Sequence, residues 1–264
     1  MRRTPLKPNI LFALLVASFF TACTSNSKQA PIAEQQTQTE NIPSWITTSY
    51  VMGHFDPADH PDFAAIPTSL ADREGLFLRK EVLDAFIQMH DTALDAGHKM
   101  FIRSATRNFD YQKGIWTRKW TGETGLSDGT RASAIADPVE RSKKILRYSS
   151  MPGTSRHHWG TDLDINSFDN DFFETGPGAE LYQWMKANAK EFGFCQPYTA
   201  KTDRRTGYEE ERWHWSYTPT SESITAYCKR HLSDDLITGF DGSKTAGQIK
   251  VVENYVLGIN SVCL

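Results

Sequence analysis

Helical and strand-like patterns alternate along this chain, and this alternation constrains its fold more than any other feature. Residues 81–96 place apolar side chains three and four positions apart and stop before Gly97, which predicts an amphipathic helix ended by glycine. Short strand-like segments cover residues 161–165 and 213–217. Helices interleaved with isolated strands predict an α+β fold, a small antiparallel sheet flanked by helices. We further expect a strand over 99–103 and helices over 138–148, 178–192, 221–232 and 245–260.

The first residues are predicted to be an export signal. Basic residues precede an apolar run, Ile10 to Phe20, that is too short to span a bilayer. The run leads into Thr-Ala-Cys23, which resembles a bacterial lipobox whose cysteine is lipidated. We therefore expect residues 1–22 to be a lipoprotein signal peptide and Cys23 to carry a membrane anchor. The alternative is an ordinary secretory signal with an incidental cysteine.

The segment after the signal has a different composition. Residues 23–45 are rich in Thr, Gln, Ser and Asn and poor in large apolar side chains, which predicts a flexible tether. Residues 46–264 are then expected to form a single domain with a C-terminal helical extension. Together with the predicted lipidation at Cys23, this organisation predicts a lipoprotein of the cell envelope that faces the periplasm.

Charge and cysteine content narrow the function classes. The chain has 29 Lys and Arg against 32 Asp and Glu, a formal net charge of -3, so it lacks the basic surface that nucleic acid requires and we exclude that partner. Beyond the signal, Cys195, Cys228 and Cys263 can form at most one disulfide. We favour Cys228 with Cys263, because that bond would pin the C-terminal tail. None of the three has zinc-finger spacing.

Two short motifs carry residues that bind metal. His157 precedes Asp164 by seven residues, and Glu211 precedes His214 by three. Imidazole nitrogen and carboxylate oxygen suit Zn²⁺, and a catalytic zinc keeps three protein ligands and one position for water. Two histidines and one aspartate meet that count, which leaves Glu211 to accept a proton from the water. Each motif alone also fits chance spacing or a solvated pair of side chains.

These motifs resemble those of a known enzyme family. S-x-H-x6-D followed about fifty residues later by E-x-W-H is similar to the zinc D-alanyl-D-alanine carboxypeptidases and dipeptidases of bacterial cell-wall metabolism, of the vancomycin-resistance carboxypeptidase type. The resemblance covers roughly residues 75 to 220. It implies that His157, Asp164 and His214 bind zinc on the small sheet and that Glu211 is the general base.

A third motif of that family lies upstream. The S-x-x-R-x4-Q pattern matches the segment from Ser104 to Gln112. By resemblance, Arg107 stabilises the oxyanion that forms at the scissile carbonyl, while Gln112 and Ser155 hold the substrate. The implied substrates are the stem peptides of peptidoglycan, and removal of the terminal D-alanine is the favoured reaction. Alternatives are L,D-carboxypeptidase, D,D-dipeptidase or endopeptidase activity, or a non-catalytic zinc-stabilised cell-wall binding module.

The sequence departs from the family at a predicted strand position and just before Arg107, where Ala105-Thr106 stand in place of the commoner Gly-Tyr. Asp162 stands where alanine is usual and shares a strand face with Asp164, so it can accept a hydrogen bond from a ligand or from another basic group. His158, next to His157, is expected to point away from the metal. Arg118 and Lys119 are further basic candidates for holding a substrate carboxylate, although solvated surface charges are the more ordinary interpretation.

Overall fold

The computed structural model describes residues 42–202 and 206–264, which belong to one compact unit. The predicted signal, Cys23 and nearly all of the predicted tether lie outside the described residues. Trp45, at the end of the predicted tether, packs against the domain, where the guanidinium carbon of Arg79 lies 4.3 Å from its ring centroid. Within the described ranges, no helix is long and apolar enough to cross a membrane.

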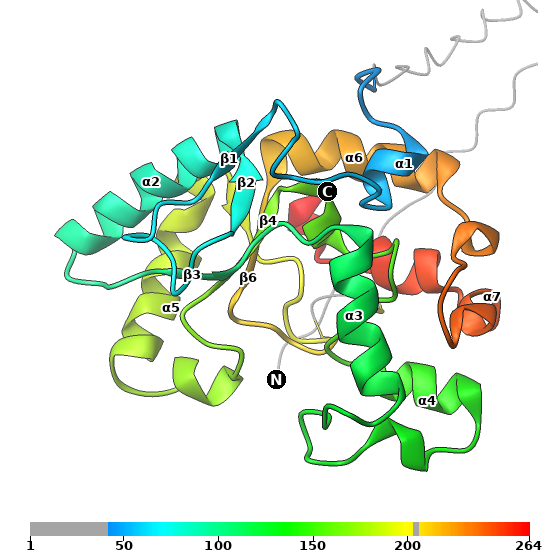
Figure 1. The fold of residues 1–264 in the computed structure, drawn as a ribbon. Coiled ribbons are helices and arrows are strands. Elements are labelled where there is room, and N and C mark those ends of the chain that lie inside the picture. The colour runs from blue at the N-terminus through cyan, green and yellow to red at the C-terminus, as the bar shows by residue number, and fades with distance from the viewer. Residues whose placement is uncertain (1–41, 203–205) are drawn as a thin grey trace, which may run out of the picture. The chain divides into compact units, whose positions relative to one another are not determined.

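Two small antiparallel sheets form the strand content of the described residues (Figure 1). The first pairs two three-residue strands, β1 (Phe63–Ala65) and β2 (Phe77–Arg79). The second has four strands in the order β3-β4-β6-β5. Its strands are β3 (Ile102–Ser104), β4 (Asp162–Ile165), β6 (His214–Tyr217) and β5 (Phe194–Cys195). The predicted α+β class, with strands near 161–165 and 213–217, is confirmed.

The four-stranded sheet has one apolar and one polar face because successive side chains of a strand alternate. Leu163 and Trp215 lie on the apolar face, which packs against helices α2 (Lys80–Asp95) and α5 (Gly176–Asn188). Figure 1 shows both helices on the same side of the sheet. The polar residues of β4 and β6 therefore lie on the opposite face, where the candidate site is found.

Local sequence explains where the helices begin and end. Helix α2 buries the apolar stripe that its spacing predicts and is followed by Gly97 at φ +89°. Helix α4 (Pro138–Ile145) begins at the expected cap, because the Asp137 carboxylate accepts hydrogen bonds from the backbone N–H groups of the next two non-proline residues. Helix α3 (Phe109–Trp120), capped by Asn108, was not predicted from the sequence.

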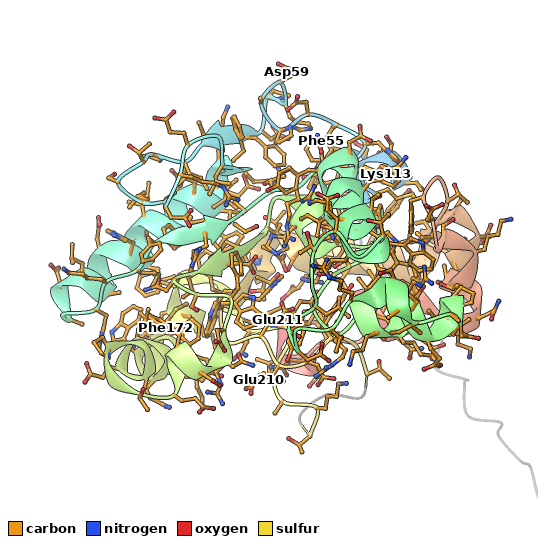
Figure 2. The ribbon with its side chains drawn as sticks, turned by 60° about the horizontal axis from the view of Figure 1, so that its bottom comes forward. Phe55, Asp59, Lys113, Phe172, Glu210 and Glu211 are labelled. Carbon is orange, nitrogen blue, oxygen red and sulfur yellow. A yellow bond between two sulfur atoms is a disulfide. The ribbon has the colours of Figure 1, made fainter. Side chains whose placement is uncertain are left out.

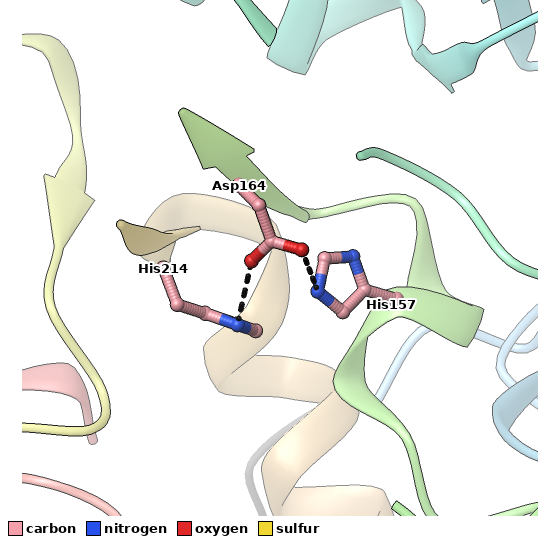
Figure 3. Close-up of side chains that lie close together, drawn as sticks. All are labelled: His157, Asp164 and His214. Atoms are coloured by element: carbon pink, nitrogen blue, oxygen red, sulfur yellow. Dashed lines mark ion pairs between the residues drawn. The ribbon is translucent and has the colours of Figure 1, made fainter. Parts of the chain in front are cut away.

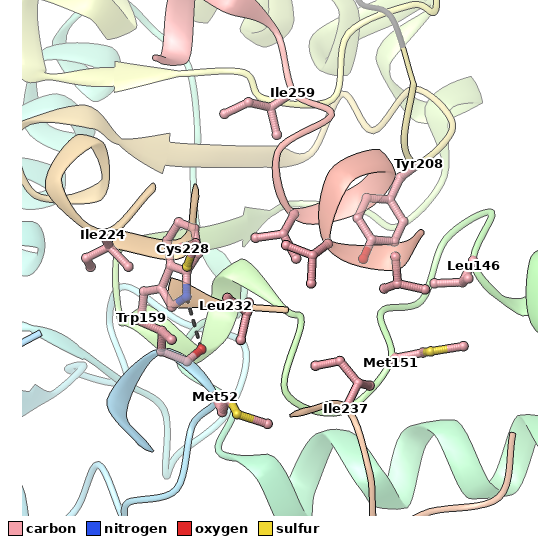
Figure 4. Packing of buried hydrophobic residues seen from close by; sticks show 14 of the residues in the cluster. Met52, Leu146, Met151, Trp159, Tyr208, Ile224, Cys228, Leu232, Ile237 and Ile259 are labelled. Carbon is pink, nitrogen blue, oxygen red and sulfur yellow. Dashed lines mark hydrogen bonds between the residues drawn. The ribbon is translucent and has the colours of Figure 1, made fainter. Parts of the chain in front are cut away.

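A second core lies on the other side of the site. It joins α1 (Thr48–Val51), α3 and α4 to the C-terminal part of the chain, which contains α6 (Thr218–His231), α7 (Ala246–Ile249) and a π-helical turn (Val252–Val256). Figure 4 shows this packing around Trp159, whose indole Nε1 donates a 3.2 Å hydrogen bond to the carbonyl of Val51. The predicted C-terminal helical segments are therefore part of the core that supports the site.

The predicted disulfide is wrong. Cys263 bonds to Cys195, with their Cα atoms 5.7 Å apart, and Cys228 is a buried free thiol. Cys228 lies on the inner face of α6 and packs in the second core, whereas Cys195 lies in edge strand β5 beside the C-terminus. The bond still pins the C-terminal tail, but it pins the tail to the sheet rather than to a helix.

Loss of this bond is expected to lower stability. The disulfide closes a loop with a sequence separation of 68 residues, so a Cys195→Ala variant should lose about 2–5 kcal/mol of unfolding free energy. Urea unfolding with and without reductant measures this. Reductant should destabilise the wild type and a Cys228→Ala variant but not Cys195→Ala. If reductant no longer destabilised the Cys228→Ala variant, the pairing of Cys195 with Cys263 would be contradicted.

Candidate active site

Three side chains from three separate segments meet on the polar face of the sheet. His157 comes from the 3₁₀ turn Arg156–Trp159, Asp164 from β4 and His214 from β6, where it pairs directly with Asp164. Each offers one ligand atom, and these atoms all lie within 4.8 Å of one another. Figure 3 shows the Asp164 carboxylate between the two imidazole rings. The structure thus brings together all three residues predicted as metal ligands.

Each histidine is held by its other ring nitrogen. His157 Nδ1 lies 2.8 Å from the carbonyl oxygen of Ala105, and His214 Nε2 lies 2.8 Å from Asp162 Oδ2. These contacts leave His157 Nε2 and His214 Nδ1 facing the Asp164 carboxylate, each 3.2 Å from one of its oxygens. Histidines that bind metal are oriented in this way, with the second nitrogen donating to a carbonyl or carboxylate.

The polar atoms at the centre of the cluster fit a cation. His157 Nε2 and Asp164 Oδ1 are buried and, within the described residues, make no hydrogen bond of acceptable geometry. Burial and the charge of Arg107 lower the pKa of His157 to about 4, so this ring is neutral, which is the form that binds metal. Burial opposes ionisation of Asp164, but the two histidines outweigh it and hold its pKa below the ordinary value.

The pKa of His214 also indicates that the site favours positive charge. Burial would lower its pKa, but contacts with the carboxylates of Asp162, Asp164 and Glu211 outweigh burial and raise it well above the ordinary value. Arg156 and Arg107 balance the three buried carboxylates around this ring only in part, and a proton on His214 or a divalent cation supplies further positive charge. The donor set of two imidazoles and one carboxylate therefore fits Zn²⁺.

Glu211 lies beside the three candidate ligands without belonging to their set. Its Oε2 is 3.3 Å from His214 Nδ1, and burial raises the pKa of its carboxyl group. Glu211, His157 and His214 line a small cavity of about 20 Å³, which is enough for one water molecule. A carboxylate in this position can exchange protons with a water held at the cluster.

The other predicted site residues line the same region. Arg107 Nη2 lies 3.4 Å from Asp164 Oδ2, and its Nη1 lies 3.4 Å from Gln112 Oε1. Gln112 is fixed because its Nε2 donates to the carbonyl of Ser150 at 2.9 Å. Ser155 also lines the small cavity, and its buried hydroxyl makes no hydrogen bond within the described part of the chain. All seven residues assigned to this site from the sequence thus converge.

Two residues next to the ligands serve the fold. His158 points away from the cluster, with Nδ1 2.6 Å from the carbonyl oxygen of Arg107 and Nε2 accepting from the backbone N–H of Gly153. Gly160 adopts φ +75° and lies so close to Phe63 that an added Cβ would come within 2.4 Å of the ring. Glycine is therefore required at the turn between His157 and Asp164.

Arg156 is a site residue that motif analysis missed. Its fully buried guanidinium donates to Asp162 Oδ2 at 3.0 Å and to Ser216 Oγ at 2.8 Å. Asp162 thus accepts from both an arginine and the candidate ligand His214, the two kinds of partner expected for it. The signal that could have revealed Arg156 is Asp162 itself, because a buried carboxylate on a strand requires a cationic partner.

The fold and the site together define a class of protein. Two imidazoles, one carboxylate and a neighbouring carboxylate outside the ligand set form the arrangement of a metallohydrolase, whose metal keeps an open position. The family model VanY, described as D-alanyl-D-alanine carboxypeptidase, matches residues 75–220. The chain belongs to this family, and the match spans every candidate site residue.

Curated relatives and solved structures match over part of their length. YodJ of Bacillus subtilis (strain 168) is 29% identical over 184 residues, which cover 67% of this chain and 60% of YodJ. A D-alanyl-D-alanine carboxypeptidase of Enterococcus faecalis (strain ATCC 700802 / V583) is 33% identical over 139 residues, 53% of this chain and 47% of that protein. The chain thus spans about half to three fifths of these relatives. The LdcB LD-carboxypeptidase structure is 25% identical, with a TM-score of 0.49, covering 65% of this chain and 73% of that chain.

Proposed function

We propose that this protein is a zinc-dependent peptidoglycan peptidase that removes the terminal D-alanine from stem peptides. The observation that carries the proposal is the buried cluster of His157, Asp164 and His214 with Glu211 beside it, inside the part of the chain that matches the carboxypeptidase family. A structural zinc is usually enclosed by four protein ligands and has no use for a neighbouring free carboxylate. The site therefore favours catalysis over a binding module.

The roles of the residues follow from their positions. When bound, Zn²⁺ polarises the scissile carbonyl and lowers the pKa of water. Glu211 takes a proton from the attacking water and passes it to the leaving amine, since its carboxylate borders the water-sized cavity. Arg107 donates hydrogen bonds to the oxygen on which negative charge develops. Gln112 holds the Arg107 guanidinium in place through its amide oxygen.

The proposed location follows from the N-terminal sequence. The basic residues, short apolar run and Cys23 support an exported lipoprotein held in the cell envelope, facing the periplasm where peptidoglycan stem peptides occur. Incorporation of labelled fatty acid into the full chain, lost in a Cys23→Ser variant, tests the anchor. Equal labelling of both chains would contradict it.

The activity is expected to depend on metal. The full chain, solubilised in detergent, should remove one alanine from a pentapeptide ending in D-alanyl-D-alanine, as seen by mass spectrometry. Chelation should abolish cleavage because the polarisation of the carbonyl and the activation of water are then lost, and added Zn²⁺ should restore it. Cleavage that survives complete removal of metal would contradict the zinc mechanism. Cleavage of a tetrapeptide, but not of the pentapeptide, would replace D,D- with L,D-specificity.

A further inference from the structure

We propose that Lys119 forms a carboxylate-binding subsite in the substrate cleft, so that this enzyme acts on peptides with a free carboxylate close to the scissile bond. The inference rests on the proposed function, because it concerns how the same cleft selects its substrate. The inference assigns this role to Lys119 and not to Arg118, its neighbour in sequence.

Helix α3 directs Lys119 toward the site. Gln112, Ile115 and Lys119 are spaced by three and four residues, so they share one face of the helix. Gln112 on this face contacts Arg107, and Ile115 and Lys119, about one and two turns further along, line the cleft. Arg118 is exposed. The helix therefore places one of two adjacent cations in the cleft and leaves the other in solvent.

Lys119 and the catalytic groups share one cavity. The cleft has a volume of about 720 Å³, within the range of ligand sites. Arg107, Asp164 and Glu211 line it together with Lys119 and Ser149. A peptide bound with its scissile carbonyl at Arg107 therefore lies in the same cavity as the Lys119 ammonium group.

The ammonium group of Lys119 forms no close ion pair within the described residues. Its Nζ donates a hydrogen bond to Ser149 Oγ, and no carboxylate of the described residues lies within 4.0 Å of it. Burial and the positive charge of Arg107 lower the pKa of Lys119, and the charge of Glu211, more than 4.0 Å away, opposes them only in part. A half-buried ammonium group without a close counter-ion is costly, and an incoming anion offsets that cost.

The other charged groups of the cleft are already paired or lie elsewhere. Arg147 contacts Asp128 and Glu209 at 3.8 and 3.6 Å, and Asp128 also pairs with Lys144. Apart from Asp128, the exposed carboxylates of the cleft come from residues 169 and 171, in the connection from β4 to α5. In Figure 2 that connection, marked by Phe172, and α3, marked by Lys113, lie on different sides of Glu211. A substrate carboxylate therefore belongs at the Lys119 side.

The carboxylate recognised by Lys119 has two possible sources, which substrate variants distinguish. One is the C-terminal carboxylate of the residue to be released, and the other is an acidic side chain on the amino side of the scissile bond. The test compares a pentapeptide ending in D-alanyl-D-alanine with its C-terminal amide, and with the same peptide whose acidic side chain is amidated. Values of kcat and KM are measured for the wild-type full chain, Lys119→Met, Lys119→Arg and Arg118→Met.

In Lys119→Met we expect KM for the unmodified peptide to rise by about tenfold to a hundredfold, the range of a charge-assisted hydrogen bond, with kcat nearly unchanged. The amidated peptide that lacks the recognised carboxylate should show the same KM with wild type and with Lys119→Met. Which of the two amidated peptides behaves in this way identifies the carboxylate that Lys119 binds. Lys119→Arg should keep most of the affinity, because it keeps the charge. Arg118→Met should behave as wild type, since Arg118 is exposed.

Two results would overturn the inference. One is an unchanged KM in Lys119→Met, and the other is an equal rise in KM for all three peptides, which would indicate a general effect on the cleft. Calorimetric binding of the same peptides to the metal-free chain separates this inference from the proposed function. If wild type cleaves nothing but binds the peptide in a Lys119-dependent and carboxylate-dependent way, the subsite stands and the proposed reaction fails. If binding is the same in Lys119→Met, the subsite fails.

Discussion

Replacement of Glu211 by Gln is expected to lower kcat/KM for the pentapeptide by about two to four orders of magnitude, the range that a positioned acid–base group contributes. The amide keeps the size of the side chain but cannot take a proton from water. Zinc content should stay at the wild-type level, because Glu211 is outside the set of three candidate ligands. Mass spectrometry of the peptide products and metal analysis of the purified variant measure the two quantities separately.

The neighbouring Glu210 provides the matched control. It is half-buried, and its carboxylate lies 3.5 Å from Arg212 Nε rather than at the cluster of candidate metal ligands. Figure 2 labels both glutamates and shows that they lie in different places, although the two residues are consecutive in the sequence. Glu210→Gln should retain activity. Loss of zinc in Glu211→Gln would assign Glu211 to the ligand set, and full activity in that variant would remove it from the mechanism.

Sequence periodicity predicted the helices whose buried faces are apolar and failed where the buried face mixes polar and apolar residues. Helix α2 shows a continuous apolar stripe, and α4 begins with the Asp137–Pro138 signal, so both were predicted. Helix α3 has Gly114 in its interior and directs the polar residues Gln112 and Lys119 inward. Its buried face combines Gln112, which contacts Arg107, with Trp116, which packs in the second core, so no continuous apolar stripe reveals it.

The residues of the candidate site were predictable because they lie in short motifs. The surrounding contacts that hold them in place were not predictable, because those contacts join residues far apart in the sequence. His157 and Asp164 are separated by one turn and one strand step, which local pattern captures. The pairing of Cys195 with Cys263 depends on where the C-terminus meets β5, and no local pattern encodes that contact. Similarly, the sequence shows that Arg118 and Lys119 are adjacent cations, and only the placement of α3 shows which of them lines the cleft.

Removal of the Asp162 carboxylate is expected to produce the largest loss of stability. Asp162 and Arg156 are both fully buried, and burial would raise the pKa of Asp162 if the charge of Arg156 and the contact with His214 did not lower it. Asp162→Ala leaves the Arg156 charge buried without a counter-ion. The free energy of unfolding should fall by about 3–5 kcal/mol, measured by urea unfolding of the metal-free chain.

The double variant Asp162→Ala/Arg156→Met distinguishes lost packing from an unpaired charge. If the cost comes from the buried guanidinium, removing both charges should recover most of the lost stability. Zinc affinity should nevertheless stay about 10- to 100-fold below wild type, because His214 Nε2 has lost its acceptor in both variants. An exposed carboxylate on α2 serves as control, and Asp84→Ala should change neither quantity. Recovery of zinc affinity in the double variant would show that Asp162 does not orient His214, whereas recovery of stability alone identifies Asp162 as the link between Arg156 and the candidate ligand His214.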